Sequence, residues 1–254
     1  MKECCVVSVK SPLIVSLALA AALAGCSSQS TDSVTGSPTP SGSSASATAS
    51  ATENGIREQS APDIVKTAST NAAAATSVHL QGDGTCPSGK FHADLALSND
   101  GLGQGEVKFS PYTLKMVSTP KTLYLQAEPA FWATMTTDAD AAKVGSKWVA
   151  VPASGNPCLA ALGSLQSVVA AYLTFTGIPV KEKSLSVYGV PAQLVSISPD
   201  ITLWVSAVGT PLPVQMSEVS SQTKMLFSEW SKPVVITVPK SSDTIDASTL
   251  AKKP

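Results

Sequence analysis

The feature that most constrains the fold is a series of short segments in which apolar and polar residues alternate. Alternation places successive side chains on opposite faces of a β-strand. Glycine- and proline-containing turns separate neighbouring segments, most clearly at residues 98–105 and 206–213. We therefore expect a largely antiparallel sheet with one apolar face. The twelve segments are residues 78–82, 90–97, 103–109, 112–118, 122–126, 147–151, 184–189, 191–198, 201–207, 212–217, 224–229 and 233–238.

Helix signals are fewer. Residues 60–77 begin with Ser60 as a capping residue and have an apolar face, and short helices are expected at residues 130–135 and 139–144. The strongest signal covers residues 156–177, with a capping Asn at its start and a Gly at its end. The predicted fold class is α+β, a curved antiparallel sheet with helices on one face. The expected helix faces are Ile64, Val65, Ala68 and Ala72 in the first helix, and Leu159, Leu162, Leu165 or Gln166, Val169 and Leu173 in the last.

The first 25 residues have the features of a secretory signal peptide. A weakly basic start precedes an apolar stretch, residues 13–23, that is too short to span a bilayer as a helix. The stretch ends in Leu-Ala-Gly-Cys, which resembles the bacterial lipobox, so we expect Cys26 to be acylated and to become the mature N-terminus; the alternative is a stray cysteine. This predicts an exported protein held by lipid on the outer face of the cell membrane.

The composition divides the rest of the chain in two. Residues 26–59 are almost entirely Ser, Thr, Ala, Gly and Pro, which predicts a tether with a reach of roughly 30 Å. Residues 60–254 suit a single domain with a core. Without Lys2, Lys10 and Glu3 of the leader, the formal net charge is −2. No basic run occurs, which argues against nucleic acid as a partner.

Two cysteines remain in the predicted domain, Cys86 and Cys158. An even pair in an exported chain favours a disulfide, and the alternative is two unpaired thiols. Neither cysteine lies in a Cys-x-x-Cys motif or near a histidine, so we expect no zinc and no other metal there.

The sequence is poor in catalytic groups. Alternation places His79 and His92 on the outer, polar face of the sheet, either as solvated side chains or as a cross-strand pair that holds an adventitious metal. No nucleophile elbow, phosphate-binding loop or zinc-protease motif occurs. We therefore expect a protein that is not an enzyme and needs no cofactor.

One stretch is unusual because residues 148–180 contain no charged residue, and the strongest helix signal lies inside it. The stretch is interrupted by Gly and Pro and is not expected to span a membrane. Three roles remain open for it: a core helix, a lid over an apolar cavity, or a surface laid against the membrane.

Several segments together resemble LolA-like actinobacterial lipoproteins, the LppX/LprAFG group. The resemblance runs from about residue 60 to residue 245 and rests on residues 121–132, 146–152, 187–198, 201–215 and 227–239. It implies an incomplete antiparallel barrel wrapped around helices, with an apolar cavity that holds the acyl chains of lipids or glycolipids for movement across the cell envelope. The Cys86 and Cys158 pair departs from the mycobacterial members, and no catalytic or cofactor motif can be transferred.

These observations predict a membrane-anchored lipoprotein that binds acyl chains of a lipid, glycolipid or lipidated molecule and carries it within the cell envelope. An envelope transporter or acceptor protein is its expected protein partner. The alternative is an envelope sensor or protein-binding module with the same fold and a filled core, and a more distant one is a hydrolase with an unrecognised site. The residues expected to line the cavity are Val78, Leu80, Phe91, Leu95, Leu97, Val107, Phe109, Leu114, Met116, Leu123, Leu125, Phe131, Trp132, Leu162, Leu165, Val169, Leu203 and Val205.

Overall fold

The computed structural model describes residues 52–253; the signal peptide, Cys26 and most of the expected tether lie outside the described residues. The described chain forms one sheet of twelve strands in the order β12-β6-β5-β4-β3-β2-β1-β11-β10-β9-β8-β7. Eleven strands pair antiparallel, and only β12 pairs parallel, with β6. The strands are β1 (Ser77–Cys86), β2 (Gly89–Ser98), β3 (Gly103–Phe109), β4 (Tyr112–Ser118), β5 (Thr122–Gln126), β6 (Trp148–Pro152), β7 (Val180–Val187), β8 (Val190–Ser196), β9 (Ile201–Ser206), β10 (Pro213–Glu218), β11 (Thr223–Ser228) and β12 (Thr244–Asp246).

The sheet consists of two meanders joined at its centre. Strands β1 to β6 follow one another in sequence, as do β7 to β11, and β1 pairs with β11 through contacts such as Leu80 opposite Phe227. Strands β7 and β12 form opposite outer edges, so the sheet is curved but not closed. The predicted α+β fold with an antiparallel half-barrel is confirmed.

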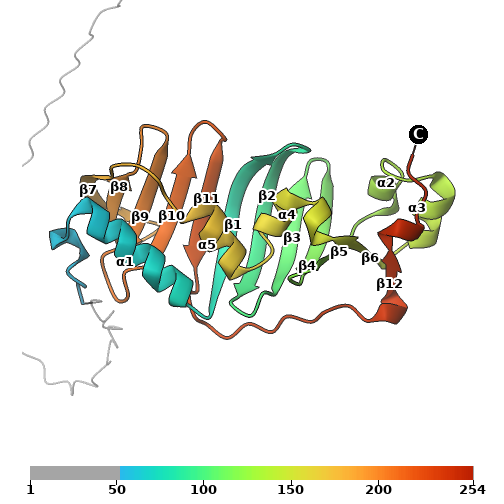
Figure 1. Cartoon of the computed structure of the whole chain (residues 1–254), viewed down its shortest axis with the longest axis horizontal. Coiled ribbons are helices and arrows are strands. Elements are labelled where there is room, and N and C mark those ends of the chain that lie inside the picture. The colour runs from blue at the N-terminus through green and yellow to red at the C-terminus, as the bar shows by residue number, and fades with distance from the viewer. Residues whose placement is uncertain (1–51, 254) are drawn as a thin grey trace, which may run out of the picture. The chain divides into compact units, whose positions relative to one another are not determined.

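Helices cover one face of this sheet, which we call the helix-covered face; the other is the open face. Figure 1 shows α1, α4 and α5 lying across the strands, whereas α2 and α3 lie beyond β5 and β6. Helix α1 begins where expected, because the Ser60 hydroxyl accepts a hydrogen bond from the Asp63 amide at 3.4 Å. Within the described chain, no helix has the length and apolar character needed to cross a bilayer. The helices are α1 (Ala61–Ala74), α2 (Pro129–Trp132), α3 (Asp138–Val144), α4 (Pro157–Ala161) and α5 (Leu165–Tyr172).

The prediction of one long helix over residues 156–177 is wrong. The stretch forms two short helices, α4 and α5, separated by Leu162, Gly163 and Ser164. Gly163 weakens the helix, and the Ser164 hydroxyl accepts a hydrogen bond from the Ser167 amide at 3.2 Å, which starts a new helix. The helical spacing of apolar residues in the sequence nevertheless continues across residues 162–164, because both helices bury one face against the sheet.

The prediction of a strand over residues 233–238 is also wrong. The segment runs extended along the lower margin of the sheet in Figure 1, from β11 to β12. Pro233 and Pro239 have no amide proton to donate to a neighbour. The Thr237 amide donates instead to the side chain of Gln104, at 3.2 Å. The segment delivers the chain to β12, a parallel edge strand that the sequence did not predict.

The folded unit starts earlier than the predicted boundary at residue 60. Glu53 forms an isolated bridge with Val208, and the Asn54 side-chain amide donates to the Gly209 carbonyl at 3.0 Å. Ile56 is fully buried in the core. Residues 52–59 therefore belong to the domain rather than to the tether. Since the described unit contains all twelve strands and their core, a chain that begins at residue 27 retains every element of the fold.

Candidate functional site

The apolar core lies between the sheet and the helices. The structure brings all eighteen residues that we expected to line a cavity into this one core. Fifteen of them are buried, and only Phe109, Phe131 and Val169 are half-buried. In this structure these side chains therefore pack against one another across the helix-covered face.

A cavity of about 530 Å³ opens beside this core. It lies where the β2–β3 and β4–β5 turns face the junction between α4 and α5. Its rim includes the exposed side chains of Asn99, Asp100 and Gln166, and its base includes the buried residues Leu123 and Gly163. It therefore joins a polar mouth to the apolar core. The remaining lining residues are Gly101, Thr119, Pro120, Ala153, Ala160, Ser164 and Ser167.

The inner wall of this cavity depends on a close approach between β3 and the α4–α5 junction. A Cβ added to Gly103 would lie 2.5 Å from the Gly163 carbonyl oxygen, so a larger residue does not fit. The Ser118 hydroxyl lies between the two segments, donating to the Gly163 carbonyl and lying 3.3 Å from that of Gly103. From the sequence, Gly103 is predicted only as a turn and strand residue, because a local pattern carries no signal of contact between distant segments.

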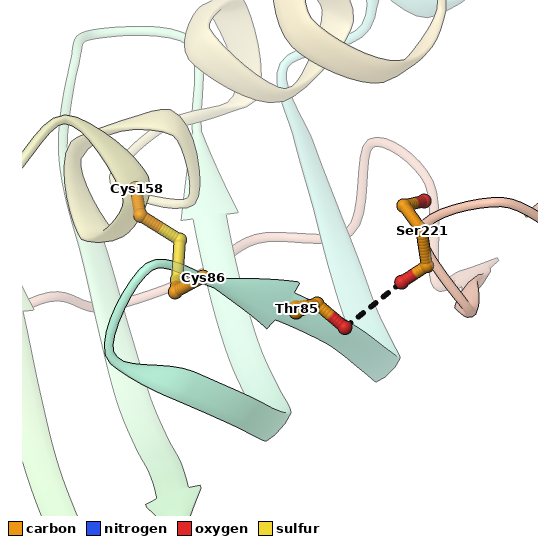
Figure 2. The surroundings of a disulfide bond; sticks show 4 residues. All are labelled: Thr85, Cys86, Cys158 and Ser221. Carbon is orange, nitrogen blue, oxygen red and sulfur yellow. Dashed lines mark hydrogen bonds between the residues drawn. A yellow bond between two sulfur atoms is a disulfide. The ribbon is translucent and has the colours of Figure 1, made fainter.

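A disulfide between Cys86 and Cys158 holds α4 against the end of β1, as predicted, with the two Cα atoms 6.0 Å apart. Figure 2 shows the bond joining the β1–β2 hairpin to the helix. In the same hairpin, the Thr85 hydroxyl donates to the Ser221 carbonyl at 2.9 Å and thereby links β1 to the β10–β11 turn. The wall that carries α4 is thus attached to the sheet covalently.

The uncharged stretch that contains α4 and α5 contributes to both the core and the cavity. One face packs into the core through buried side chains, among them Leu162 and Leu165, whereas Ala160 and Ser167 face the cavity. Helix α5 is also attached to α1, since the Ser69 hydroxyl donates to the Leu173 carbonyl at 2.8 Å. Of the three roles left open by the sequence, the structure supports core packing.

Tyr172 ends α5 and is the titratable group of the helix. Burial, and to a lesser extent the carboxylate of Glu218, raise the pKa of its phenol above the ordinary value. The phenol is therefore neutral at physiological pH and adds no charge to the apolar surroundings.

Both histidines lie on the open face, as expected, but they do not pair with each other. His79 lies opposite Ala96 in the register, and its Nε2 is 2.8 Å from Asp94 Oδ1. His92 lies opposite Asp83, with Nδ1 2.8 Å from the Asp83 carboxylate. In the described part of the chain, no cluster of three or more His, Cys, Asp or Glu side chains is arranged to hold a metal ion.

The Ser228 hydroxyl lies 3.3 Å from His79 Nδ1, which places a serine, a histidine and an aspartate in one row. The serine and the aspartate contact the ring nitrogens in the reverse of the order found in serine hydrolases. The row lies on the surface of paired strands, whose backbone amides are used in the sheet and do not provide an oxyanion hole. It is a surface hydrogen-bond network that connects β2, β1 and β11.

Two further cavities lie elsewhere on the described chain. One of about 330 Å³ is lined on the open face by Gln81, His92, Asp94 and Gly105, with Glu106 and Lys108. Another of about 630 Å³ lies near β4, β5 and the start of α2 and includes charged residues such as Lys115 and Glu128. None of the eighteen predicted residues lines either one. Of these three cavities, only the one beside α4 and α5 is lined by a residue from the predicted set, Leu123, although Ala127 of the core also lines the cavity near α2.

Comparisons with known proteins give limited similarity. No protein-family profile matches the sequence, and no curated protein matches it. Among solved structures, the chain is similar to LprF from Mycobacterium bovis, with 20% identity and a TM-score of 0.47 over 70% of this chain and 96% of that one. It is also similar to an uncharacterized conserved protein from Thermus thermophilus, with 12% identity and a TM-score of 0.39 over 74% and 99% of the two chains. LprF is one of the lipoproteins for which the LppX/LprAFG group, which the sequence resembles, is named.

Proposed function

We propose that this protein is anchored by an acylated Cys26 to the outer face of the cell membrane and binds the acyl chains of a lipid, glycolipid or lipidated molecule. It carries this cargo within the cell envelope, to or from a transporter or acceptor protein. The observation that carries the proposal is the cavity of about 530 Å³ that joins a polar rim to the apolar core at Leu123. Its volume lies within the range of roughly 300–1,000 Å³ that is usual for small-molecule sites.

The chemistry of the cavity fits an amphipathic ligand. At the rim, the exposed side chains of Asn99 and Asp100 are suited to polar contacts with a head group, whereas the Gln166 amide already donates to the Asn99 carbonyl. An acyl chain would extend inward toward Leu123, and each buried CH₂ group contributes about 0.8 kcal/mol. No metal or cofactor takes part, and binding does not require a reaction.

An acyl chain that is too long for the cavity requires the apolar core to open. In this open state α5 moves away from the sheet to admit the acyl chain. The eighteen core residues predicted to line a cavity then surround that acyl chain. The disulfide keeps α4 attached to β1 during this movement, because it joins Cys86 to Cys158 covalently. Movement of α5 at the α4–α5 junction requires the hydrogen bond from the Ser118 hydroxyl to the Gly163 carbonyl to break.

One observation favours the alternative, a sensor or protein-binding module with a filled core. Fifteen of the eighteen predicted lining residues are buried in the structure, and the cavity beside α4 and α5 includes only Leu123 among them. Under this alternative the cavity is a surface cleft without an acyl ligand, and the core does not open.

A binding titration separates the two functions. The probe is a fluorescent long-chain fatty acid added to a purified chain of residues 27–254. The variant Ala160→Trp fills the cavity from α4, and Ala142→Trp, at an exposed position of α3, is the matched control. Saturable binding by the wild type and the control, with at least roughly tenfold weaker binding by Ala160→Trp, supports the carrier. Absence of binding, or equal binding by both variants, contradicts it.

A further inference from the structure

The extended segment between β11 and β12 carries backbone groups that the described fold leaves unpaired. We call residues 233–239 the strap, and their sequence is PVVITVP. The amide of Thr237 is the one in the strap that has a hydrogen-bond partner within residues 52–253, and this partner is the side-chain oxygen of Gln104. The strap therefore has the donors and acceptors of a β-strand without a neighbouring strand.

The side chains of the strap alternate between the sheet and water, as they do in a β-strand. Val234 and Ile236 are half-buried, whereas Val235 is 85% exposed and Thr237 is also exposed. The residues between the two prolines are all Val, Ile or Thr, which favour strands. In Figure 1 the strap runs along the lower margin of the sheet, and no described helix or strand is drawn below it. The edge of the strap that points away from the domain is therefore accessible to a partner.

Both prolines of the strap lie on the edge that faces its own domain. In an extended chain the N–H and C=O groups of every second residue point to the same edge. Since Thr237 donates toward Gln104 on β3, the odd-numbered residues of the strap, both prolines included, share this inner edge. The residues that present N–H and C=O groups on the outer edge are Val234, Ile236 and Val238. The outer edge thus keeps every donor, and the missing amide protons are confined to the inner edge.

The strap reads almost the same in both directions about Ile236. A proline stands three residues away on either side and a valine two residues away, and the remaining pair is Val235 and Thr237. When two copies of such a sequence run antiparallel, like residues lie opposite each other. A contact between identical surfaces related by a two-fold axis has this self-complementary form.

We propose that the strap is a dimerisation site, in which its outer edge pairs antiparallel with the strap of a second copy of this chain. The two-fold axis passes through Ile236, which exchanges two hydrogen bonds with Ile236 of the second copy, and Val234 lies opposite Val238 on either side. This register gives every outer-edge residue a partner, whereas a shift along the strap leaves some of them unpaired. Because the strap has a single free edge, the contact closes as a dimer and does not extend into a fibre.

The pairing is short, so the dimer is expected to be weak. The carbonyl of Lys232 accepts a hydrogen bond from the Ser77 hydroxyl, and that of Lys240 accepts one from Thr244, so the ladder ends at the prolines. Two strands of this length form a contact smaller than the roughly 1,200–2,000 Å² of stable interfaces. The register also brings Lys232 close to Lys240 of the second copy, and this repulsion is largely screened only at physiological ionic strength.

Sedimentation velocity of residues 27–254, over a range of protein concentrations at physiological ionic strength, tests the dimer. The variant Ile236→Pro removes the amide donor on the two-fold axis. The matched control, Val235→Pro, removes the neighbouring donor on the inner edge. We expect a concentration-dependent dimer in the wild type and the control, and dimerisation at least roughly tenfold weaker in Ile236→Pro. Melting curves check that both variants are folded.

Cross-linking tests the register with variants that keep every backbone donor. Directly opposed residues of a hydrogen-bonded antiparallel pair have Cα atoms about 5.5 Å apart, which suits a disulfide. Ile236→Cys should therefore form a covalent dimer under mild oxidation. Val235→Cys is at a more exposed position, but it lies diagonally from its counterpart, at roughly 7–8 Å, and should cross-link more slowly.

Three results would overturn the proposal. They are a wild type that stays monomeric at every concentration, equal dimerisation by the two proline variants, and cross-linking of Val235→Cys at least as fast as that of Ile236→Cys. A strap that serves a strand of another protein instead would give the first of these results. The fatty-acid titration is a separate readout, because none of the strap residues lines the cavity beside α4 and α5. Loss of the dimer therefore leaves the proposed cargo function standing, and absence of fatty-acid binding leaves the dimer standing.

Discussion

Removal of the disulfide should destabilise the protein mainly through its unfolded state. The bond joins residues separated by 72 positions, from the end of β1 to α4. In the chain-entropy model, closing a loop of this length removes enough freedom from the unfolded chain to stabilise the fold by about 4 kcal/mol. For a domain of this size each kcal/mol corresponds to about 2–4 °C in Tm, so we expect a loss of roughly 8–16 °C.

The assay is calorimetry of residues 27–254, in which Cys86 and Cys158 are the remaining cysteines. Wild type is measured oxidised and reduced, and a double variant with serine at both positions is the control. The reductant should lower the Tm of the wild type and leave the double variant unchanged. Urea denaturation adds a second readout, because an unfolded chain without the cross-link exposes more surface and its m-value should rise.

Coincident melting curves for oxidised and reduced wild type would refute this reasoning, and so would two free thiols in the oxidised protein by mass spectrometry. A lower Tm with an unchanged m-value would place the effect in the folded state instead. In that case the bond would act by holding α4 in position rather than by restricting the unfolded chain.

Three further predictions concern the wall of the cavity, the start of α1 and the phenol of Tyr172. Gly103→Ala should lower the free energy of unfolding in urea by roughly 1–3 kcal/mol, because the added Cβ meets a backbone carbonyl. In the control Gly155→Ala, an added Cβ has nothing within 4 Å, so the free energy of unfolding should change by no more than about 0.5 kcal/mol. Equal losses in the two variants would contradict the close approach of Gly103 to Gly163. Ser60→Ala should lower the free energy of unfolding by about 1 kcal/mol, because it removes the N-terminal cap of α1. An unchanged urea midpoint would show that the cap does not contribute to stability. Burial and Glu218 raise the pKa of Tyr172, so the unfolded chain loses the phenol proton at a lower pH than the folded one, and the free energy of unfolding should fall as the pH rises above 10. Tyr172→Phe should lessen that fall. Identical curves of stability against alkaline pH for the variant and the wild type would contradict this prediction.

The sequence predicted the elements whose signal is local. Alternation identified eleven strands because most of them have one face in the core and one toward solvent, as in β2, where Phe91 and Leu95 are buried and Asp94 is exposed. The edge strand β7 alternates in sequence but has no buried residue. The cap of α1 and the disulfide were predicted for similar reasons, since the capping serine and the paired cysteines are recognisable without the fold.

Contacts between distant segments were not predictable in this way. The apolar period runs through Gly163 without interruption, so the break between α4 and α5 was missed. The parallel pairing of β12 with β6 has no alternation long enough to detect, because the strand has three residues. The cavity depends on the approach of Gly103 to Gly163, which follows from the order in which the strands and helices are packed rather than from any single segment.

The most direct test of the proposed function is native mass spectrometry of the chain purified from its own host without added lipid. We expect a complex whose excess mass is that of one acyl-containing molecule, which is released on unfolding and identified by fragmentation. The Ala160→Trp variant, which fills the cavity, should carry much less of it, and Ala142→Trp should carry as much as the wild type. Wild-type protein that is uniformly free of lipid would contradict the account and favour a sensor with a filled core.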